Sequence, residues 1–124
     1  MTPLVIEAHD DVTPKVTLDF QKGIFEISGW SHPEDAIAFY TPVLNWLNGY
    51  AQTPNSGTNF HFKLQYYNTA SAKQIFRVIS ALEEVAKKSN VKIHWHHDTE
   101  DTDMLSSGER FSKMSTIPFE FVSN

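Results

Sequence analysis

Two short stretches of the sequence carry side chains whose types and spacing could support chemistry. Residues 68–71 (Asn-Thr-Ala-Ser) place an amide and two hydroxyl groups directly after two aromatic residues. Residues 94–98 (HWHHD) bring three imidazoles and a carboxylate together. Hydroxyl groups between a strand and a helix can cap the helix, bind an anion, attack a substrate or accept a phosphate, whereas neighbouring imidazoles are typical of a metal site. The two stretches therefore predict different classes of function.

The hydroxyl stretch admits two interpretations. Ser71 and Gln74 form an S-x-x-Q capping box, which makes Ser71 the expected N-cap of the following helix. Thr69 then precedes the cap, at the carboxyl end of a strand, where the loops of α/β sheets are exposed. A phosphate on Thr69 would meet free backbone N–H groups and the positive end of the helix dipole, with Lys73 and Arg77 one and two turns along. The residues alone leave a simple cap and a phospho-acceptor equally open.

The histidine stretch is the candidate metal site. In a strand, His94 and His96 share one face, and Asp98 or Glu100 could complete a ligand set. No H-E-x-x-H or comparable motif supplies further ligands at a fixed spacing, and the acidic run 98–103 lacks the glycine and the final glutamate of a calcium loop. A small metal-dependent hydrolase or metal sensor that uses His94, His96 and Asp98 is the rival function. No cofactor is expected otherwise.

Other catalytic arrangements are missing from the sequence. It has no cysteine, no G-x-S-x-G elbow, no G-x-G-x-x-G loop and no G-x-x-x-x-G-K-[ST] loop. Trp30, Trp46 and Trp95 could line a ligand pocket, but aromatic residues at such spacings more often belong to a core. We therefore expect a protein that is not an enzyme.

Composition and charge narrow the class further. With 124 residues, 40% of them hydrophobic, the chain is expected to form a single domain, residues 1–124. Ten Lys and Arg against fifteen Asp and Glu do not supply the basic patch that nucleic acid requires. The N-terminus lacks a signal-peptide pattern, and no apolar run reaches the ~18 residues of a membrane span. Together with the lack of cysteine, these features predict a cytoplasmic protein that binds neither nucleic acid nor membrane.

Strand-like and helix-like segments alternate along the chain. Patterns typical of strands occur at residues 4–8, 16–20, 24–30, 59–66, 91–95 and 117–122. A turn at residues 21–23 joins the second and third of these into a hairpin. The side chains expected on the inner face of the fourth strand are Phe60, Phe62, Leu64 and Tyr66.

Three helices are expected between these strands. The first follows a capping box of Ser31 and Glu34 and is kinked by Pro42, the second covers residues 71–88, and the third covers residues 103–114. The stripes expected to face the core are Ile37, Tyr40, Leu44 and Leu47 in the first helix and Ile75, Ile79, Leu82 and Ala86 in the second. Strands that alternate with helices after an opening hairpin predict an α/β fold with a mixed, largely parallel sheet.

The whole chain resembles the SiaC-type family of small bacterial phosphoproteins. The matching segments are PLVIEA (3–8), TPKVTLDF (13–20), GIFEISG (23–29), PEDAIAFYTPVLNWL (33–47), FKLQYYNTASAK (62–73) and TIPFEF (116–121). The central N-T-A-S element is the most specific of them. Members are similar in fold to the STAS domains of anti-sigma-factor antagonists, in which a Ser or Thr at a strand-to-helix junction is reversibly phosphorylated.

This resemblance implies a phosphorylation switch and its partners. Thr69 would accept the phosphate, Ser71 would be the cap and the alternative acceptor, and the sequence leaves open whether Ser28 is also modified. A protein kinase would phosphorylate Thr69 and a PP2C-type phosphatase would remove the phosphate. The unphosphorylated protein would bind and activate a diguanylate cyclase, which raises cyclic di-GMP and favours biofilm formation or aggregation. The expected partner-binding residues are Asn68, Thr69, Ala70, Lys73, Arg77 and Ser80.

Overall fold

Strands and helices follow one another along the chain in the order that the sequence pattern predicts. The structure, a computed structural model, describes all residues 1–124. The strands are β1 (Leu4–Ile6), β2 (Lys15–Asp19), β3 (Ile24–Ser31), β4 (Gly57–Tyr67), β5 (Asn90–His97) and β6 (Phe119–Ser123). The helices are α1 (Ala36–Tyr50), α2 (Thr69–Val85) and α3 (Thr102–Lys113). None of them combines the length and the apolar character that crossing a membrane requires.

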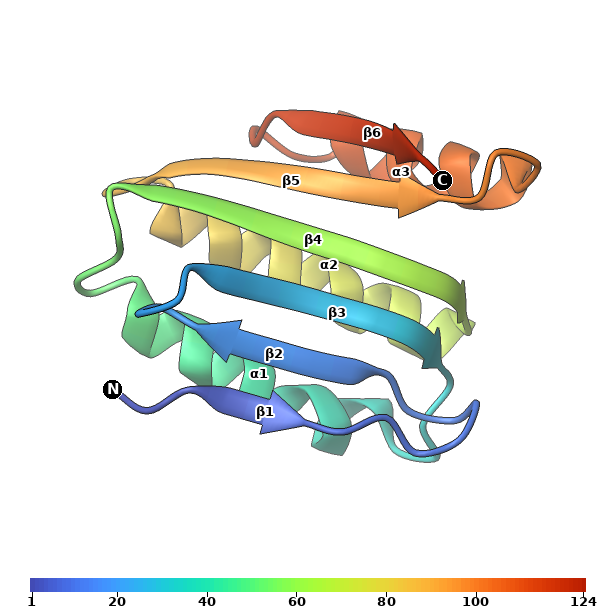
Figure 1. The fold of residues 1–124 in the computed structure, drawn as a ribbon, viewed down its shortest axis with the longest axis horizontal. Helices are drawn as coiled ribbons and strands as arrows, with labels where there is room; N and C mark the ends of the chain where they lie inside the picture. Colours follow the sequence, from blue (N-terminus) through green and yellow to red (C-terminus); the bar gives the residue numbers. More distant parts are fainter.

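All strands belong to one sheet, and their order in the sheet is their order in the chain (Figure 1). β1, β2 and β3 pair antiparallel, whereas β3, β4, β5 and β6 pair parallel. The predicted α/β class and the opening hairpin are therefore confirmed. Because two of the five pairings are antiparallel, the sheet is better described as mixed than as largely parallel.

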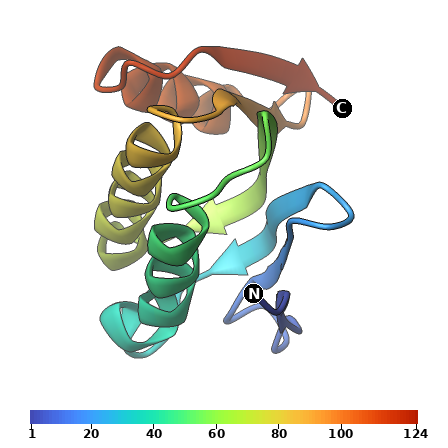
Figure 2. The ribbon, with the colours of Figure 1, turned by 90° about the vertical axis from the view of Figure 1, so that its left-hand side faces the viewer.

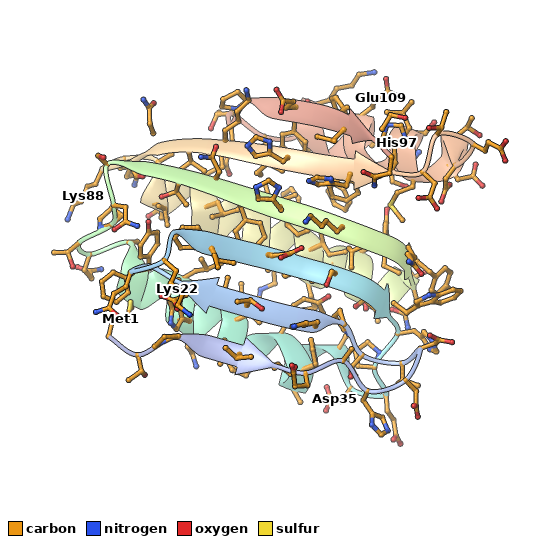
Figure 3. The ribbon with its side chains drawn as sticks, in the orientation of Figure 1. Met1, Lys22, Asp35, Lys88, His97 and Glu109 are labelled. Carbon is orange, nitrogen blue, oxygen red and sulfur yellow. The ribbon has the colours of Figure 1, made fainter.

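Each parallel connection passes through one helix and returns to the neighbouring strand. Such crossovers are right-handed, so three successive crossovers in one direction place their helices on the same face of the sheet. Figure 2 shows α1, α2 and α3 together on one side of the strands. The opposite face is uncovered, and Figure 3 looks onto it with its side chains drawn. The fold therefore has one face that is packed and one face that is open.

The core lies between the sheet and the helices. Period-two alternation buries one face of the central strands, including Phe25, Ile27, Phe60, Phe62 and Trp95. The residues buried in α1 are Ala36, Tyr40, Val43, Leu47 and Tyr50. The residues buried in α2 are Ser71, Gln74, Ile75, Val78, Ile79, Ala81, Leu82 and Val85. The predicted stripes are thus correct only in part.

Ile37 and Ala86 are the clearest departures from those stripes. Ile37 is 62% exposed, because the buried side of α1 is set by Ala36 and Tyr40, which flank it in the chain. Ala86 is exposed and caps the C-terminus of α2, which ends at Val85 rather than at residue 88. The buried side of α1 is therefore rotated relative to the prediction, whereas α2 buries the predicted Ile75, Ile79 and Leu82 and only ends earlier than predicted.

The start of α1 also differs from the prediction. Its N-cap is Asp35, whose Oδ1 accepts a hydrogen bond from the N–H of Ala38 at 3.0 Å. Ser31, which we expected in a capping box, is instead the last residue of β3 and is fully buried. The helix runs through Pro42 without a break, at a position where the side chain is exposed. The capping box is therefore wrong, since Asp35 caps from a position nearer the helix.

The inward alternation of β4 breaks near its carboxyl end. The parallel register between β3 and β4 is irregular between Gly29 and Trp30, and Gly29 has a φ of 101°. Tyr66, expected on the inner face, is exposed, while Tyr67 packs against the core. This shift brings the Tyr67 ring under the helices at the point where α2 begins.

Candidate functional site

The amino terminus of α2 is capped by Asn68 and not by Ser71. Asn68 Oδ1 accepts a hydrogen bond from the N–H of Ser71 at 2.8 Å, and the N–H of Asn68 donates to the carbonyl of Ser31 at 3.0 Å. Thr69 is therefore the first residue of the helix rather than a residue before the cap. The prediction of Ser71 as the cap is wrong because Asn is an equally good N-cap and stands three residues earlier.

Ser71 instead belongs to a buried chain of three hydroxyl groups, which we call the hydroxyl triad (Ser31, Tyr40 and Ser71). Ser31 Oγ donates to Ser71 Oγ at 2.9 Å and lies 2.7 Å from Tyr40 Oη. All three residues are fully buried. Burial raises the pKa of Tyr40 to about 12, although its hydrogen bond with Ser31 acts in the opposite direction. The triad ties the end of β3 and the core side of α1 to the first turn of α2.

Thr69 lies outside the hydroxyl triad, on the exposed side of α2. Thr69, Ala70, Lys73 and Arg77 are all exposed, and Ser80 is half-buried. Lys73 follows Thr69 by four residues, so the two side chains are neighbours on the helix surface. The first turn also offers unpaired backbone N–H groups and the positive end of the helix dipole. The structure thus brings the predicted partner-binding residues onto one surface, with its most positive end at Thr69.

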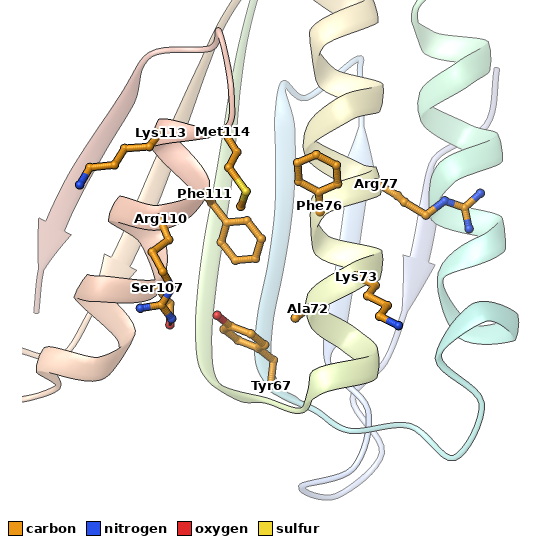
Figure 4. Close-up of a pocket in the computed structure, with 10 residues that line it drawn as sticks. All are labelled: Tyr67, Ala72, Lys73, Phe76, Arg77, Ser107, Arg110, Phe111, Lys113 and Met114. Atoms are coloured by element: carbon orange, nitrogen blue, oxygen red, sulfur yellow. The ribbon is translucent and has the colours of Figure 1, made fainter.

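A groove runs beside this surface, between α2 and α3 (Figure 4). Its volume is about 750 Å³. The residues that line it are Tyr67, Ala72, Lys73, Phe76, Arg77, Ser107, Arg110, Phe111, Lys113 and Met114. The sequence pattern does not reveal the groove, because its two walls come from helices that are separated by a whole strand.

The predicted histidine cluster lies on the open face of the sheet and includes a residue that the prediction missed. The rings of His61 and His94 stack with centroids 4.4 Å apart, and His61 Nδ1 is 2.9 Å from His96 Nε2. His94 also contacts Asn59 Oδ1 at 2.9 Å and Glu120 Oε2 at 3.1 Å. His61 stands opposite His94 in the parallel pairing of β4 with β5, so only that pairing reveals it.

The environment of His61 and His96 disfavours their protonated forms. Partial burial lowers the pKa of His61, with smaller contributions from His94, His96 and Lys63. Partial burial also lowers the pKa of His96, again with Lys63 and His94 as nearby positive groups. The contact between the two ring nitrogens agrees with this direction, because one of them must lack a proton to accept the hydrogen bond.

The metal site expected from His94, His96 and Asp98 is not assembled. Asp98 is exposed in the loop that follows β5, and its carbonyl oxygen lies 3.0 Å from Nδ1 of His97. His97 itself is buried, on the opposite face from His94 and His96. No three His, Asp or Glu side chains are placed so that they could share a metal ion. The rival function, a metal-dependent hydrolase or metal sensor, therefore has no assembled set of metal ligands.

The three tryptophans do not share a pocket either. Trp95 is fully buried in the core, where its ring lies 5.3 Å from that of Phe62. Trp46 donates its indole N–H to the carbonyl of Thr2 at 2.8 Å, beside the N-terminus. Trp30 lies on the exposed end of β3. Each tryptophan therefore has its own structural surroundings.

The chain matches one family model over almost its whole length. The model of the family described as SiaC family regulatory phosphoprotein matches residues 6–124. The protein PA14_02130 of Pseudomonas aeruginosa (strain UCBPP-PA14) is 26% identical over 108 residues, which cover 86% of each chain.

Solved structures give the same result. The structure of SiaC of Pseudomonas aeruginosa superposes with a TM-score of 0.87 and 25% identity over all of both chains. A chain in the crystal structure of diguanylate cyclase SiaD in complex with its activator SiaC, from the same organism, superposes with a TM-score of 0.89 and 24% identity. That match covers 98% of this chain and 99% of the other.

Proposed function

Because the chain belongs to the SiaC family of regulatory phosphoproteins, we propose that it is a non-enzymatic cytoplasmic switch controlled by phosphorylation of Thr69. In the unphosphorylated state it binds and activates a diguanylate cyclase, which raises cyclic di-GMP and promotes biofilm formation or aggregation. Support for this partner comes from the SiaC protein of Pseudomonas aeruginosa, which shares the fold and is the activator of the cyclase SiaD in their crystal complex.

The contrast between Thr69 and Ser71 is the observation that carries the proposal. Thr69 is exposed at the first position of α2, whereas Ser71 is fully buried and hydrogen-bonded to Ser31. A kinase needs access to the hydroxyl that it modifies, so only Thr69 is available without unfolding the start of the helix. This favours Thr69 over Ser71 as the acceptor, and the cap on Asn68 remains intact during the reaction.

The same geometry explains how a phosphate on Thr69 would act. It adds about −1.5 to −2 charges at pH 7, which the N–H groups of the first turn and Lys73 can stabilise in the free protein. A partner that covers Thr69 removes water from the phosphate, and burying a charge that lacks cations is costly. Phosphorylation therefore leaves the fold intact and weakens the complex.

The proposed partner surface consists of Asn68, Thr69, Ala70, Lys73, Arg77 and Ser80. These residues form one side of α2, beginning at its positive end. A protein kinase and a PP2C-type phosphatase act on the same Thr69 hydroxyl, so both must approach this surface too. The cyclase and the two modifying enzymes consequently compete for one side of one helix.

Site mapping by mass spectrometry tests the proposal. We expect a phosphate on Thr69 after incubation with the cognate kinase, and none on the Thr69→Ala variant, which still binds the cyclase. Thr69→Asp should bind the cyclase more weakly, although it carries only one charge. The matched control is Ser71→Ala, which should keep the phosphate on Thr69.

Two results would contradict the proposal. A phosphate found on Ser71 and never on Thr69 would show that the assignment of the acceptor is wrong. A cyclase that binds the phosphorylated and unphosphorylated proteins with equal affinity would show that phosphorylation is not the switch.

A further inference from the structure

The two sides of α2 are covered to different extents. α1 packs closely along α2, whereas α3 packs mainly on β5 and β6 and hardly touches α2. The separation between α2 and α3 leaves the groove of about 750 Å³ open to solvent.

The floor of the groove is apolar and accessible. Phe76 of α2 is 41% exposed and Met114 at the end of α3 is 56% exposed. Tyr67 and Phe111 lie between them, with ring centroids 6.2 Å apart. Figure 4 shows all four side chains in the space between the two helices. A contiguous apolar surface bordered by polar residues is a feature of protein interaction sites.

Four cations flank this apolar floor, and none of them has an acidic partner. Lys73 and Arg77 line the groove from α2, and Arg110 and Lys113 line it from α3. Figure 4 shows the charged ends of Lys73 and Arg77 directed away from α3, and Lys73 also lines a hollow that includes Glu34 and Asp35. None of the four forms a salt bridge. Of the other lysines, Lys15, Lys63, Lys87 and Lys92 form salt bridges, whereas Lys22 and Lys88 do not.

This charge distribution runs against the charge of the whole protein. The chain carries a net charge of −5, yet no Asp or Glu lines the groove. Unpaired cations on both sides of an apolar strip complement a ligand that is apolar in the middle and acidic along both edges. A helix with one apolar stripe and acidic flanks has that pattern.

We propose that the groove between α2 and α3 binds an acidic amphipathic helix of a partner protein. Its apolar stripe packs on Phe76, Phe111 and Met114, and its carboxylates pair with the cations on both sides. The inference deepens the proposed function and depends on it only for the identity of the partner, which would be the cyclase. Lys73 also connects the two, since it neighbours both Thr69 and the groove and would be shared between a phosphate and the bound helix.

A synthetic peptide tests the groove without any cyclase or kinase. The probe is a peptide of roughly 18 residues, long enough to form a helix, with Leu at helical spacing and Glu on both flanks. We expect it to bind the unphosphorylated protein and to shift the amide resonances of α2 and α3 in NMR spectra. Its affinity should fall as salt is added, because the ion pairs are exposed.

Two variants and two matched controls identify the contacts. Phe76→Ser, and the double variant Arg110→Glu with Lys113→Glu, should each weaken peptide binding by about tenfold or more. Ile37→Ser removes an exposed apolar residue from α1, and Lys87→Glu with Lys88→Glu makes the same change in charge at the other end of α2. Both controls should bind as the unmodified protein does, and circular dichroism should show that all four variants fold.

Several outcomes would overturn the proposal. One is equal binding of a peptide with Lys in place of Glu, or of a peptide of the same composition with scattered Leu. Another is a set of resonance shifts on the open sheet face or beside α1. If the protein binds anionic lipid vesicles and Phe76→Ser abolishes that binding, the ligand of the groove is a membrane surface and not a partner's helix. If the protein self-associates and the same variant abolishes self-association, the ligand of the groove is a second copy of the chain.

The result also separates this inference from the proposed switch. If Thr69→Asp leaves peptide binding unchanged, the groove still binds an acidic helix, but Lys73 is not shared between Thr69 and the bound helix. If phosphate maps to Thr69 but the protein binds no acidic helix, the proposed phosphorylation switch stands and the proposed role of the groove is wrong.

Discussion

The two flanks of α2 use the same helix in opposite ways. On the side of α1, the hydroxyl triad and close helix packing tie the start of the helix to β3 and α1. On the side of α3, aromatic and thioether groups remain exposed between unpaired cations. Buried polar groups that are fully hydrogen-bonded stabilise one arrangement of the surrounding elements, whereas exposed apolar groups can be buried by a binding partner. The first flank therefore holds the helix in place, and the second is available to a partner.

The largest effect is expected from the inner side of α2, which supports both flanks. Ile79 is 1% exposed and lies in the core. Ile79→Ala should lower the free energy of unfolding by ~2–5 kcal/mol, because the side chain leaves a cavity that the surroundings fill only partly. Urea denaturation measures this loss. A change below about 1 kcal/mol would mean that α2 contributes much less to the core than its burial indicates.

A second substitution tests whether α3 is held by the sheet rather than by α2. A Cβ on Gly108 would overlap the indole of Trp95 on β5. Overpacking costs up to about 3 kcal/mol, and the better helix propensity of Ala returns about 1, so Gly108→Ala should destabilise the fold by ~2 kcal/mol. Gly49→Ala in α1 is the control, because its Cβ meets only the flexible end of Met1. Equal stabilities would show that α3 can move away from β5 freely.

The hydroxyl triad supplies a third test, with a smaller effect. Ser71→Ala removes the acceptor for the Ser31 hydroxyl but leaves its contact with Tyr40. We expect a loss of about 1 kcal/mol in the free energy of unfolding, at the low end for an unpaired buried group. Thr69→Ala, two residues away and exposed, should change stability by less than about 0.5 kcal/mol. Equal losses of stability in the two variants would show that Ser71 contributes no more to the fold than the exposed Thr69 does.

The open face of the sheet offers the smallest test, because it belongs to neither flank. His61 and His96 have pKa values below the ordinary value in the folded protein, so the folded state binds their protons less readily than the unfolded state does. Their contribution to stability is present above about pH 6.5 and is lost as the pH falls through the folded pKa. Thermal unfolding of the native protein should therefore occur at lower temperature at acidic pH.

His61→Gln should reduce that pH dependence. The control is His9→Gln, since the side chain of His9 is 79% exposed. If the two variants and the native protein lose the same stability on acidification, the cluster is not the cause.

The existence and order of the helices and strands could be predicted because each has a strong period of two or of 3.6 residues. The helix starts could not. Asn68 and Ser71 are both good caps, as are Ser31 and Asp35, so local preference does not choose between them. The choice is made by tertiary structure, since Ser31 and Ser71 are buried against one another and are no longer free to cap.

The same limit applies to the functional surfaces. The choice of Thr69 as the proposed phospho-acceptor rests on a family resemblance and on a strand-to-helix junction that the local sequence contains in full. The third member of the histidine cluster depends on the pairing of β4 with β5, and the groove depends on the distance between two helices. Neither quantity leaves a periodic trace in the sequence.

The agreement between strand order and chain order has a consequence for synthesis. Every pairing in the sheet joins strands that are consecutive in the chain, so each new strand adds to a sheet that earlier residues have already made. Thr69 and the hydroxyl triad are complete once β5 has emerged from the ribosome, whereas the second wall of the groove, α3, is translated afterwards. A nascent chain thus offers Thr69, the proposed phospho-acceptor, before it offers the groove, and the proposed site for an acidic helix forms only after α3 has been translated.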